Sequence, residues 1–312
     1  FKNKEDQEVK IGKPDWLKTK ISSGKEYRET KKVVKEHKLH TICESGKCPN
    51  QAECWSAGTA TFMILGDNCN SSCQFCNVNT GKTEEVDPFE ALRVAKSIKL
   101  MGLKHAVITS VDRDDLKDGG ANAWKRTVEL VRKHNPGITI ETLIPDFKGE
   151  WENLNPIIEV APEIVSHNME TVRRITPMVR VQAKYERSLN VLKNLHEGGI
   201  QKTKSGLMVG LGEFQNEVLE TMDDLLEVGV KVLTIGQYMQ PTKKHLAVAE
   251  FAHPDTFAFY KEEGEKRKGG RRSRKKKKGK RKEERRKQKI IFCNDTATTE
   301  IYTLSLHDAL PN

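Results

Sequence analysis

The sequence predicts an α/β fold, namely a partial (β/α)6 TIM-like barrel with an N-terminal extension. Short β-branched runs alternate with amphipathic stretches six times along the middle of the chain. Such alternation is typical of a parallel sheet with right-handed crossovers. A doubly wound sheet is the structural alternative, but no GxGxxG motif opens a helix after the first run, which disfavours it. Six units are fewer than the eight of a closed barrel, so a partial barrel is expected.

The six expected strands are short and rich in β-branched residues. They are Thr61–Leu65, Ala106–Ser110, Thr139–Leu143, Ile164–His167, Ser205–Gly210 and Val232–Gln237. Amphipathic patterns between them predict helices over Pro88–Met101, Ala121–Lys133, Tyr185–His196 and Glu217–Val228. The first of these ends at Gly102, and glycine there is a signal for the end of a helix.

The chain divides into three segments by composition. Residues 1–60 form the N-terminal extension, residues 61–264 the barrel, and residues 265–312 a low-complexity basic and adapter-like tail. From Glu265 to Lys289 nearly every residue is Lys, Arg, Gly or Glu, as in a translated purine tract, and the final residues resemble translated sequencing-adapter DNA. We expect the native sequence to stop near Gly264 and the tail to be an artefact that does not fold alone. A solvated basic tail that binds nucleic acid is the alternative.

Charge separates the tail from the rest of the chain. The net charge is +10, yet residues 1–260 carry 36 basic and 36 acidic groups. The barrel therefore has no basic surplus with which to attract nucleic acid. No apolar run is long enough for a membrane helix. The first residues, FKNKEDQEVK, contain no secretory signal, and the missing initial Met predicts a fragment or a processed start.

Six of the seven cysteines lie between Cys43 and Cys76; the seventh is Cys293. In a large chain without an export signal, metal ligation fits this pattern better than disulfides. Cys69, Cys73 and Cys76 form a CxxxCxxC motif just after the first strand, and barrel enzymes carry their active-site residues in the loops that follow strands. Three thiolates suit a four-iron cluster with one open iron, whereas structural zinc prefers four ligands. Zinc or buried structural cysteine is the alternative.

A second triplet precedes the first strand. Cys43, Cys48 and Cys54 form a CxxxxCxxxxxC motif, which alone also suits structural zinc. CxxxCxxC after the first strand of a partial barrel resembles the radical S-adenosylmethionine (SAM) superfamily. The two triplets together resemble the lipoyl synthase family. The words KPDWLK, TICESGKCPNQAECW, GTATFMILGD, TSVDRDDLKDGGA, HNMETV, KSGLMVGLGE and GQYMQPTKKHL carry the same resemblance from about Lys13 to Gly264.

The resemblance implies a radical SAM sulfurtransferase that inserts two sulfur atoms at C6 and C8 of a protein-bound octanoyl-lysine to form the lipoyl cofactor. It implies two 4Fe–4S clusters, one on Cys69, Cys73 and Cys76 that binds and cleaves SAM, and an auxiliary sulfur source on Cys43, Cys48 and Cys54. The clusters then carry the chemistry, and no catalytic side chain is assigned. Two other functions remain open: a methylthiotransferase-like two-cluster enzyme, which usually adds an RNA-binding module, and a zinc protein that binds nucleic acid.

The resemblance also implies partners and a location. The partners are an octanoylated lipoyl carrier, either glycine cleavage H protein or a 2-oxoacid dehydrogenase E2 domain, and an electron donor such as ferredoxin or flavodoxin. Cluster chemistry requires a reducing interior, most simply the bacterial cytoplasm, with a mitochondrial or plastid matrix as the alternative. The family carries a C-terminal Arg-Ser-Ser-Tyr word whose serine ligates the auxiliary cluster. This sequence lacks that word. We therefore expect the chain as written to cleave SAM but to insert sulfur poorly.

Several polar residues at strand ends are further candidates. Asn168 and Glu170 follow the fourth strand and are expected to bind SAM; a helix-capping role for Asn168 is the alternative. Asp112–Asp115 is expected to shape the cavity, meet the carrier or form a solvated loop. The remaining candidates are Lys204 and Ser205 for structural work at the bottom face, Gln237, Tyr238 and Gln240 for lining the cavity, and His167 as a structural histidine.

Overall fold

The computed structural model describes residues 13–17, 25–36, 41–45, 51–56, 59–276 and 301–302. Its centre is a curved sheet of six parallel strands in the order in which they occur in the sequence. The strands are β1 (Thr61–Ile64), β4 (His105–Ser110), β5 (Thr139–Leu143), β6 (Ile164–Ser166), β7 (Thr203–Val209) and β8 (Val232–Gln237). Strands β1 and β8 are not paired, so the barrel is partial, as the sequence predicts.

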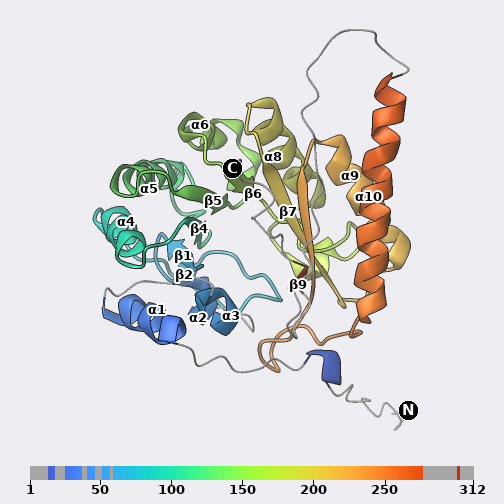
Figure 1. Cartoon of the computed structure of the whole chain (residues 1–312), viewed down its shortest axis with the longest axis horizontal. Coiled ribbons are helices and arrows are strands. Elements are labelled where there is room, and N and C mark those ends of the chain that lie inside the picture. Colours follow the sequence, from blue (N-terminus) through green and yellow to red (C-terminus); the bar gives the residue numbers. More distant parts are fainter. Residues whose placement is uncertain are drawn as a thin grey trace.

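Helices cover the outer face of the sheet (Figure 1). They are α4 (Glu90–Leu100), α5 (Ala121–His134), α6 (Trp151–Val160), α8 (Tyr185–Glu197), α9 (Gln215–Glu227) and α10 (Pro254–Lys276). Two shorter elements, η2 (Phe147–Gly149) and α7 (Thr176–Val179), lie in the loops after β5 and β6. Among the described residues no helix is long and apolar enough to cross a membrane.

Apolar side chains fill the space between the sheet and the helices in two clusters. One joins β1, β4 and β5 to α4, α5 and α6, with Phe62, Ile108 and Trp124 fully buried. The other joins β7 and β8 to α8, α9 and α10. Each such large side chain contributes about 1.5–3 kcal/mol by leaving water. The rigid sheet that results fixes the loops at its carboxyl edge, where the candidate site lies.

Most of the N-terminal extension packs on the β1 side of the barrel, but its first described residues lie near the start of α10, where the Trp16 ring meets the His253 ring edge-on at 5.2 Å. Its described elements are η1 (Asp15–Leu17), α1 (Lys25–Glu36), α2 (Ile42–Ser45) and α3 (Gln51–Ser56). Val34 of α1 and Trp55 of α3 are buried in the same cluster as β1. Thr41 forms an antiparallel bridge with Phe62. The extension is therefore continuous with the barrel core.

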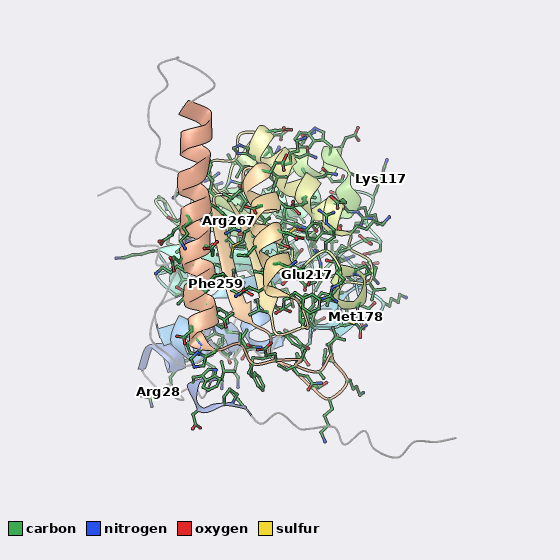
Figure 2. All side chains as sticks on the ribbon, turned by 90° about the vertical axis from the view of Figure 1, so that its right-hand side faces the viewer. Arg28, Lys117, Met178, Glu217, Phe259 and Arg267 are labelled. Atoms are coloured by element: carbon green, nitrogen blue, oxygen red, sulfur yellow. The ribbon has the colours of Figure 1, made fainter. Side chains whose placement is uncertain are left out.

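Helix α10 runs through Gly264, near which we expect the native sequence to stop, and ends at Lys276. Its first half packs on the barrel through buried Phe257 and Tyr260. Arg267 pairs with Glu263 on the same helix and with Asp223 of α9, alongside which α10 lies in Figure 2. A two-residue strand of the tail, β9 (Ile301–Tyr302), pairs antiparallel with β8. The described parts of residues 265–312 are therefore a helix end and an edge strand.

Candidate functional site

The CxxxCxxC motif forms a loop at the carboxyl end of β1. The chain leaves β1 through a turn in which Leu65 and Gly66 both have positive φ, 69° and 94°. Glu90 at the start of α4 stabilises this turn, accepting hydrogen bonds from the amides of Leu65 (2.7 Å) and Gly66 (3.4 Å). The loop then begins and ends in a short parallel ladder between β2 (Asn68–Cys69) and β3 (Asn79–Thr80). The ladder brings the two ends of the cysteine loop together.

The three thiols of the loop are half-buried, and none forms a disulfide. The Cys69 sulfur accepts hydrogen bonds from the amides of Asp112 (3.2 Å) and Ser71 (3.4 Å). The Ser71 hydroxyl lies 3.9 Å from the Cys73 sulfur. The Cys76 amide donates to the Cys73 carbonyl at 3.1 Å, which folds the second half of the loop into a turn. These donors favour a thiolate over a thiol at each sulfur that they face.

Burial works against ionisation of the same thiols. It raises the pKa of Cys69 to about 11 and, although Arg180 acts in the opposite direction, the pKa of Cys73 to about 12. Burial also raises the pKa of Cys76. The free loop therefore keeps these groups protonated at neutral pH, and a bound cation would have to displace the protons. Half-buried sulfurs with nearby N–H donors are a donor set that fits an iron–sulfur cluster.

Within the described part of the chain, no group of three or more His, Cys, Asp or Glu residues is placed to hold a metal ion. A mononuclear site draws its ligands to about 2 Å from one point. A four-iron cluster instead takes each thiolate on a different iron. Convergence on one ion is therefore not the arrangement that a four-iron cluster requires.

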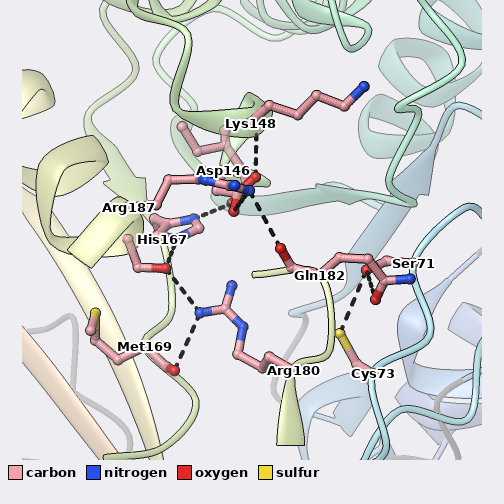
Figure 3. Close-up of polar contacts among 11 residues, drawn as sticks. Ser71, Cys73, Asp146, Lys148, His167, Met169, Arg180, Gln182 and Arg187 are labelled. Carbon is pink, nitrogen blue, oxygen red and sulfur yellow. Dashed lines mark hydrogen bonds and ion pairs between the residues drawn. The ribbon is translucent and has the colours of Figure 1, made fainter. Parts of the chain in front are cut away.

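Segments from two other loops hold the cysteine loop, and Figure 3 shows the contact that Gln182 makes. After β4, the Asp112 carbonyl accepts from the Asn70 amide at 3.1 Å. After α7, the Gln182 side-chain oxygen accepts from the Ser72 amide (3.2 Å) and the Ser71 hydroxyl (3.3 Å). The sequence analysis singles out Asp112 but not Gln182, because no local pattern marks a glutamine as the partner of a loop 110 residues earlier.

Arg113, within the Asp112–Asp115 candidate, is a buried link between loops. Its side chain is 3% exposed and donates twice to the Asp115 carboxylate, at 2.9 and 2.8 Å. It also donates to the carbonyls of Leu65 (3.2 Å) and Glu84 (2.9 Å). The hydrogen bond from Arg113 lowers the pKa of Asp115 to about 2. Burial raises the pKa of Asp112, beside the thiols, to about 6. This stretch therefore holds the base of the cysteine loop.

Asn168 and Glu170 lie at the carboxyl end of β6, facing β7. Glu170 has a φ of 64°, and its backbone pairs with that of β7: its amide donates to Gly206 at 3.0 Å and its carbonyl accepts from Met208 at 2.8 Å. Burial raises the pKa of the Glu170 carboxyl, and its charge raises the pKa of Cys73 in turn. This acid therefore lies close to the cysteine loop. The alternative role for Asn168 is wrong, because α7 begins only at Thr176 and no helix starts beside Asn168.

His167 is a structural histidine, as expected. It is buried, with Nδ1 2.9 Å from the Ile144 carbonyl and Nε2 2.9 Å from the Ser188 hydroxyl. Burial and the charge of Arg180 lower its pKa to about 4, so the ring is neutral. Arg180 donates to the same Ser188 hydroxyl at 2.9 Å and to the Met169 carbonyl at 3.3 Å (Figure 3). The sequence analysis does not single out Arg180, because it follows a one-turn helix without a recognisable motif.

Gln237, Tyr238 and Gln240, which are expected to line the cavity, each bond to a backbone carbonyl of the segment that follows β8. Gln237 is buried and bonds to backbone groups, including the carbonyl of Glu250 at 3.0 Å. Tyr238 donates to the Leu246 carbonyl at 2.8 Å, and Gln240 donates to the His245 carbonyl at 2.8 Å. Through these hydrogen bonds all three residues hold the segment that follows β8.

Lys204 and Ser205 do structural work, as expected. Lys204 pairs with buried Glu141 at 2.7 Å, and the Ser205 hydroxyl accepts from the Met169 amide at 3.2 Å. Burial alone would raise the pKa of Glu141, but Lys204 and His105 outweigh it and lower the pKa to about 2. Ser166 adds a hydrogen bond to the same carboxylate at 2.9 Å.

Of the second triplet, the structure describes the Cys54 side chain, which is half-buried on α3 and packs against the core of the β1 side. The side chain of Cys43 and the whole of Cys48 lie outside the described residues, as does Cys293. One contact ties the two motifs together. The Asn77 side chain, directly after Cys76, donates to the Ser45 carbonyl at 2.9 Å, two residues beyond Cys43.

Comparisons with known protein families and sequences identify the family of this chain. A model of the radical SAM superfamily matches residues 63–225, and a model of the N-terminal domain of lipoyl synthase matches residues 2–48. The chain is 60% identical over 252 residues to a lipoyl synthase of Christiangramia forsetii, covering 81% of this chain and 86% of that protein. It is 58% identical over 254 residues to a mitochondrial lipoyl synthase of Nematostella vectensis, covering 81% and 87%.

Solved structures share the fold at low sequence identity. Streptococcus suis SuiB bound to precursor peptide SuiA superposes with a TM-score of 0.53 at 11% identity, covering 80% of this chain and 50% of that chain. The FeFe-hydrogenase maturase HydG from Carboxydothermus hydrogenoformans superposes with a TM-score of 0.52 at 14% identity, covering 73% and 61%. These two likenesses concern the barrel architecture alone.

Proposed function

Because this chain belongs to the lipoyl synthase family of the radical SAM superfamily, we propose that Cys69, Cys73 and Cys76 hold one of its two clusters and that Cys43, Cys48 and Cys54 hold the other. The family reaction is the insertion of two sulfur atoms into an octanoyl group on a carrier protein. Its cofactors are SAM and 4Fe–4S clusters, which when bound supply the radical and the sulfur. The substrate C–H bonds are too weakly acidic for any side-chain base, so the protein contributes binding, orientation and exclusion of water.

One observation carries the assignment of the first cluster. The cysteine loop lies at the carboxyl end of β1, where its ends are joined by a ladder and the sulfurs of Cys69 and Cys76 accept hydrogen bonds from backbone N–H groups. A loop held in this way presents its thiolates without having to be ordered by the metal alone. The hydrogen bond between Asn77 and Ser45 supports the second assignment, because it holds the segment that begins at Cys43 beside the end of the cysteine loop.

We propose that Glu170 and Asn168 bind SAM. SAM carries an amino group and a ribose, for which a carboxylate and an amide oxygen are suitable acceptors. Glu170 supports this role by lying near Cys73 and Cys76, whose pKa its charge raises. Burial favours the protonated form of the Glu170 carboxyl, and a cationic group bound beside it would favour the carboxylate instead.

Iron analysis of two triple variants tests the assignment. Wild-type chain reconstituted without oxygen should hold about eight irons. Cys69→Ala/Cys73→Ala/Cys76→Ala and the equivalent variant of the second triplet should each hold about half as many. Only the second variant should still cleave SAM to 5′-deoxyadenosine. The Cys293→Ala variant is the matched control and should keep all its iron. A colourless zinc protein, or a full iron complement in either triple variant, would contradict the assignment.

We propose specific partners on the same basis. The acceptor is an octanoylated glycine cleavage H protein or 2-oxoacid dehydrogenase E2 domain, and the reductant is a ferredoxin or flavodoxin. The site of action is a reducing interior, either bacterial cytoplasm or an organelle matrix. Mass analysis of each octanoylated carrier, incubated with SAM and each reductant, should show sulfur-containing product in low yield with the true acceptor, because this sequence lacks the Arg-Ser-Ser-Tyr word whose serine ligates the auxiliary cluster. A carrier that gives no such product where another carrier does is not the acceptor, and a full yield would contradict the expected poor insertion.

We also propose that residues 61–264 are the catalytic barrel, with residues 1–60 as its cluster-binding extension, and that residues 265–312 contribute nothing to the reaction. The side chains of α10 that are buried in the barrel core, Phe257 and Tyr260, precede Gly264. Beyond Gly264, Arg267 pairs with Asp223 on the surface of α9, and β9 pairs with the edge of β8. Brief trypsin treatment should remove the Lys- and Arg-rich segment and leave SAM cleavage unchanged. Loss of SAM cleavage in step with loss of the tail would overturn the proposed boundary.

A further inference from the structure

The segment between β8 and α10, residues 238–253, crosses the cysteine loop, and we call it the strap. His245 of the strap places Nε2 3.0 Å from the carbonyl oxygen of Cys76, 169 residues earlier in the sequence. Beside it, the Leu246 amide donates to the Gln74 carbonyl at 3.3 Å. The strap therefore contacts the cysteine loop through two backbone carbonyls, one of which belongs to a proposed cluster ligand.

The direction of the histidine hydrogen bond follows from its partners. A carbonyl only accepts, so Nε2 carries the proton that is donated to Cys76. In the neutral ring Nδ1 is then an acceptor, and the Thr242 hydroxyl lies 2.8 Å from it as the donor. The Lys244 amide donates to the same hydroxyl oxygen at 3.3 Å. Thr242 thus selects the tautomer and fixes the plane of the ring.

The strap is itself anchored on the barrel. At its first residue, the Tyr238 amide donates to the Val209 carbonyl of β7 at 2.8 Å. The buried Tyr238 side chain donates to the carbonyl of Leu246, next to His245. The Gln237 side chain accepts from the Ala252 amide at 2.8 Å, and the Ala249 amide donates to the Gly210 carbonyl at 2.9 Å. Because the strap is held at both ends, the His245 side chain presents its N–H at one place, which a flexible loop would not do.

We infer that His245 is a positioning residue of the SAM-cleaving cluster, which it serves by fixing the Cys76 peptide. The inference rests on the proposed assignment of Cys69, Cys73 and Cys76. The hydrogen bond fixes the peptide that follows the last ligand, and therefore the direction in which the Cys76 sulfur points. It also offsets the negative end of the Cys76 carbonyl dipole, which belongs to a proposed ligand. Groups of this kind orient ligands and tune cluster potentials, and removing them commonly costs about 10–100-fold in metal affinity.

The test uses the full chain in a Cys43→Ala/Cys48→Ala/Cys54→Ala background, so that one cluster remains. His245→Leu removes the N–H, His245→Gln keeps a side-chain N–H of similar reach, and Thr242→Val keeps the histidine but loses its orienting hydroxyl. Each reconstituted variant is exposed to an iron chelator without oxygen, and the electron paramagnetic resonance spectrum of its reduced cluster is recorded. His253→Leu is the matched control, an exposed histidine at the end of the strap that pairs with Asp255.

We expect His245→Leu to lose iron about tenfold faster and to show an altered spectrum. His245→Gln and His253→Leu should resemble the parent, and Thr242→Val should lie between. A parental rate and spectrum for His245→Leu would overturn the inference while leaving the cluster assignment intact; a parent without iron would overturn the assignment itself. If His245→Leu fails to fold, Thr242→Val decides, and a parental rate and spectrum in that variant would overturn the inference.

Discussion

Replacing Lys204 with Met should destabilise the barrel strongly, because it leaves the buried carboxylate of Glu141 without its main partner. The two groups are 2.7 Å apart, with side chains 16% and 6% exposed. The pKa of Glu141 falls from its ordinary 4.5 to about 2, a difference that corresponds to about 3 kcal/mol of folding stability. Breaking a buried pair by removing one partner costs about 3–5 kcal/mol, in agreement with that value.

The sign of the pH dependence provides a second check. A carboxyl whose pKa is lowered by folding stabilises fully above its unfolded value of about 4.5, and that stabilisation is lost as pH falls through the folded value of about 2. In Lys204→Met the cation is gone and burial raises the pKa of Glu141 instead. The variant then gains stability on acidification, so the deficit relative to wild type should shrink from pH 7 to pH 5.

Urea unfolding without oxygen, followed by circular dichroism, measures these effects. Lys125→Met is the matched control, since Lys125 pairs with Glu159 at 2.6 Å on the surface, and its midpoint should not move. Glu141→Gln/Lys204→Met should recover part of the loss, because no charge is left unpaired. The reasoning is refuted if Lys204→Met costs less than about 1 kcal/mol at pH 7, or if Glu141→Gln/Lys204→Met is no more stable than Lys204→Met.

Three further predictions concern the loops. Arg113→Gln should lower iron content after reconstitution about tenfold at limiting iron, because the Leu65 carbonyl loses its buried donor; unchanged iron would count against this role. Gly210→Ala should lower the free energy of unfolding by about 2–4 kcal/mol, since the new Cβ would lie 2.4 Å from a strap carbonyl at a φ of +96°. Gly102→Ala is the control: its Cβ would meet open space, and thermal unfolding should show a loss of about 1 kcal/mol. Glu170→Gln should raise the Kd for SAM about tenfold by calorimetry, and an unchanged Kd would exclude its proposed role.

The strands and most barrel helices are predictable from the sequence because the residue pattern that favours each element lies within that element. A strand buried on both faces needs a run of apolar β-branched residues, so Val232–Gln237 is predicted and observed with the same bounds. Helix α6 is not predicted, because Pro156 lies inside it and reads as a helix breaker. Its buried face, with Leu154 and Ile157 in the core, outweighs the lost hydrogen bond. Short ladders such as β2 with β3 have no sequence period to detect.

The candidate site is only partly predictable for the same reason. The spacing of Cys69, Cys73 and Cys76 identifies the ligands directly, since three thiolates in one loop can reach one centre. Gln182 and His245 leave no such signal. Each acts through contacts with residues more than 100 positions away. His245 lies within the word GQYMQPTKKHL, but that word indicates the family and not the role of any one residue in it.

The link between Cys76 and His245 has a consequence for biogenesis. Ribosomes add about 5–20 residues per second, so the histidine is synthesised roughly 10–30 s after the last cysteine of the motif. During that interval the cysteine loop can fold against the strands already made, but it lacks the hydrogen bond from His245. Iron delivered during translation would meet an incomplete binding site. The centre can therefore mature only after the last barrel strand has been translated. The order of residues along the chain thus sets the time at which metal can be loaded.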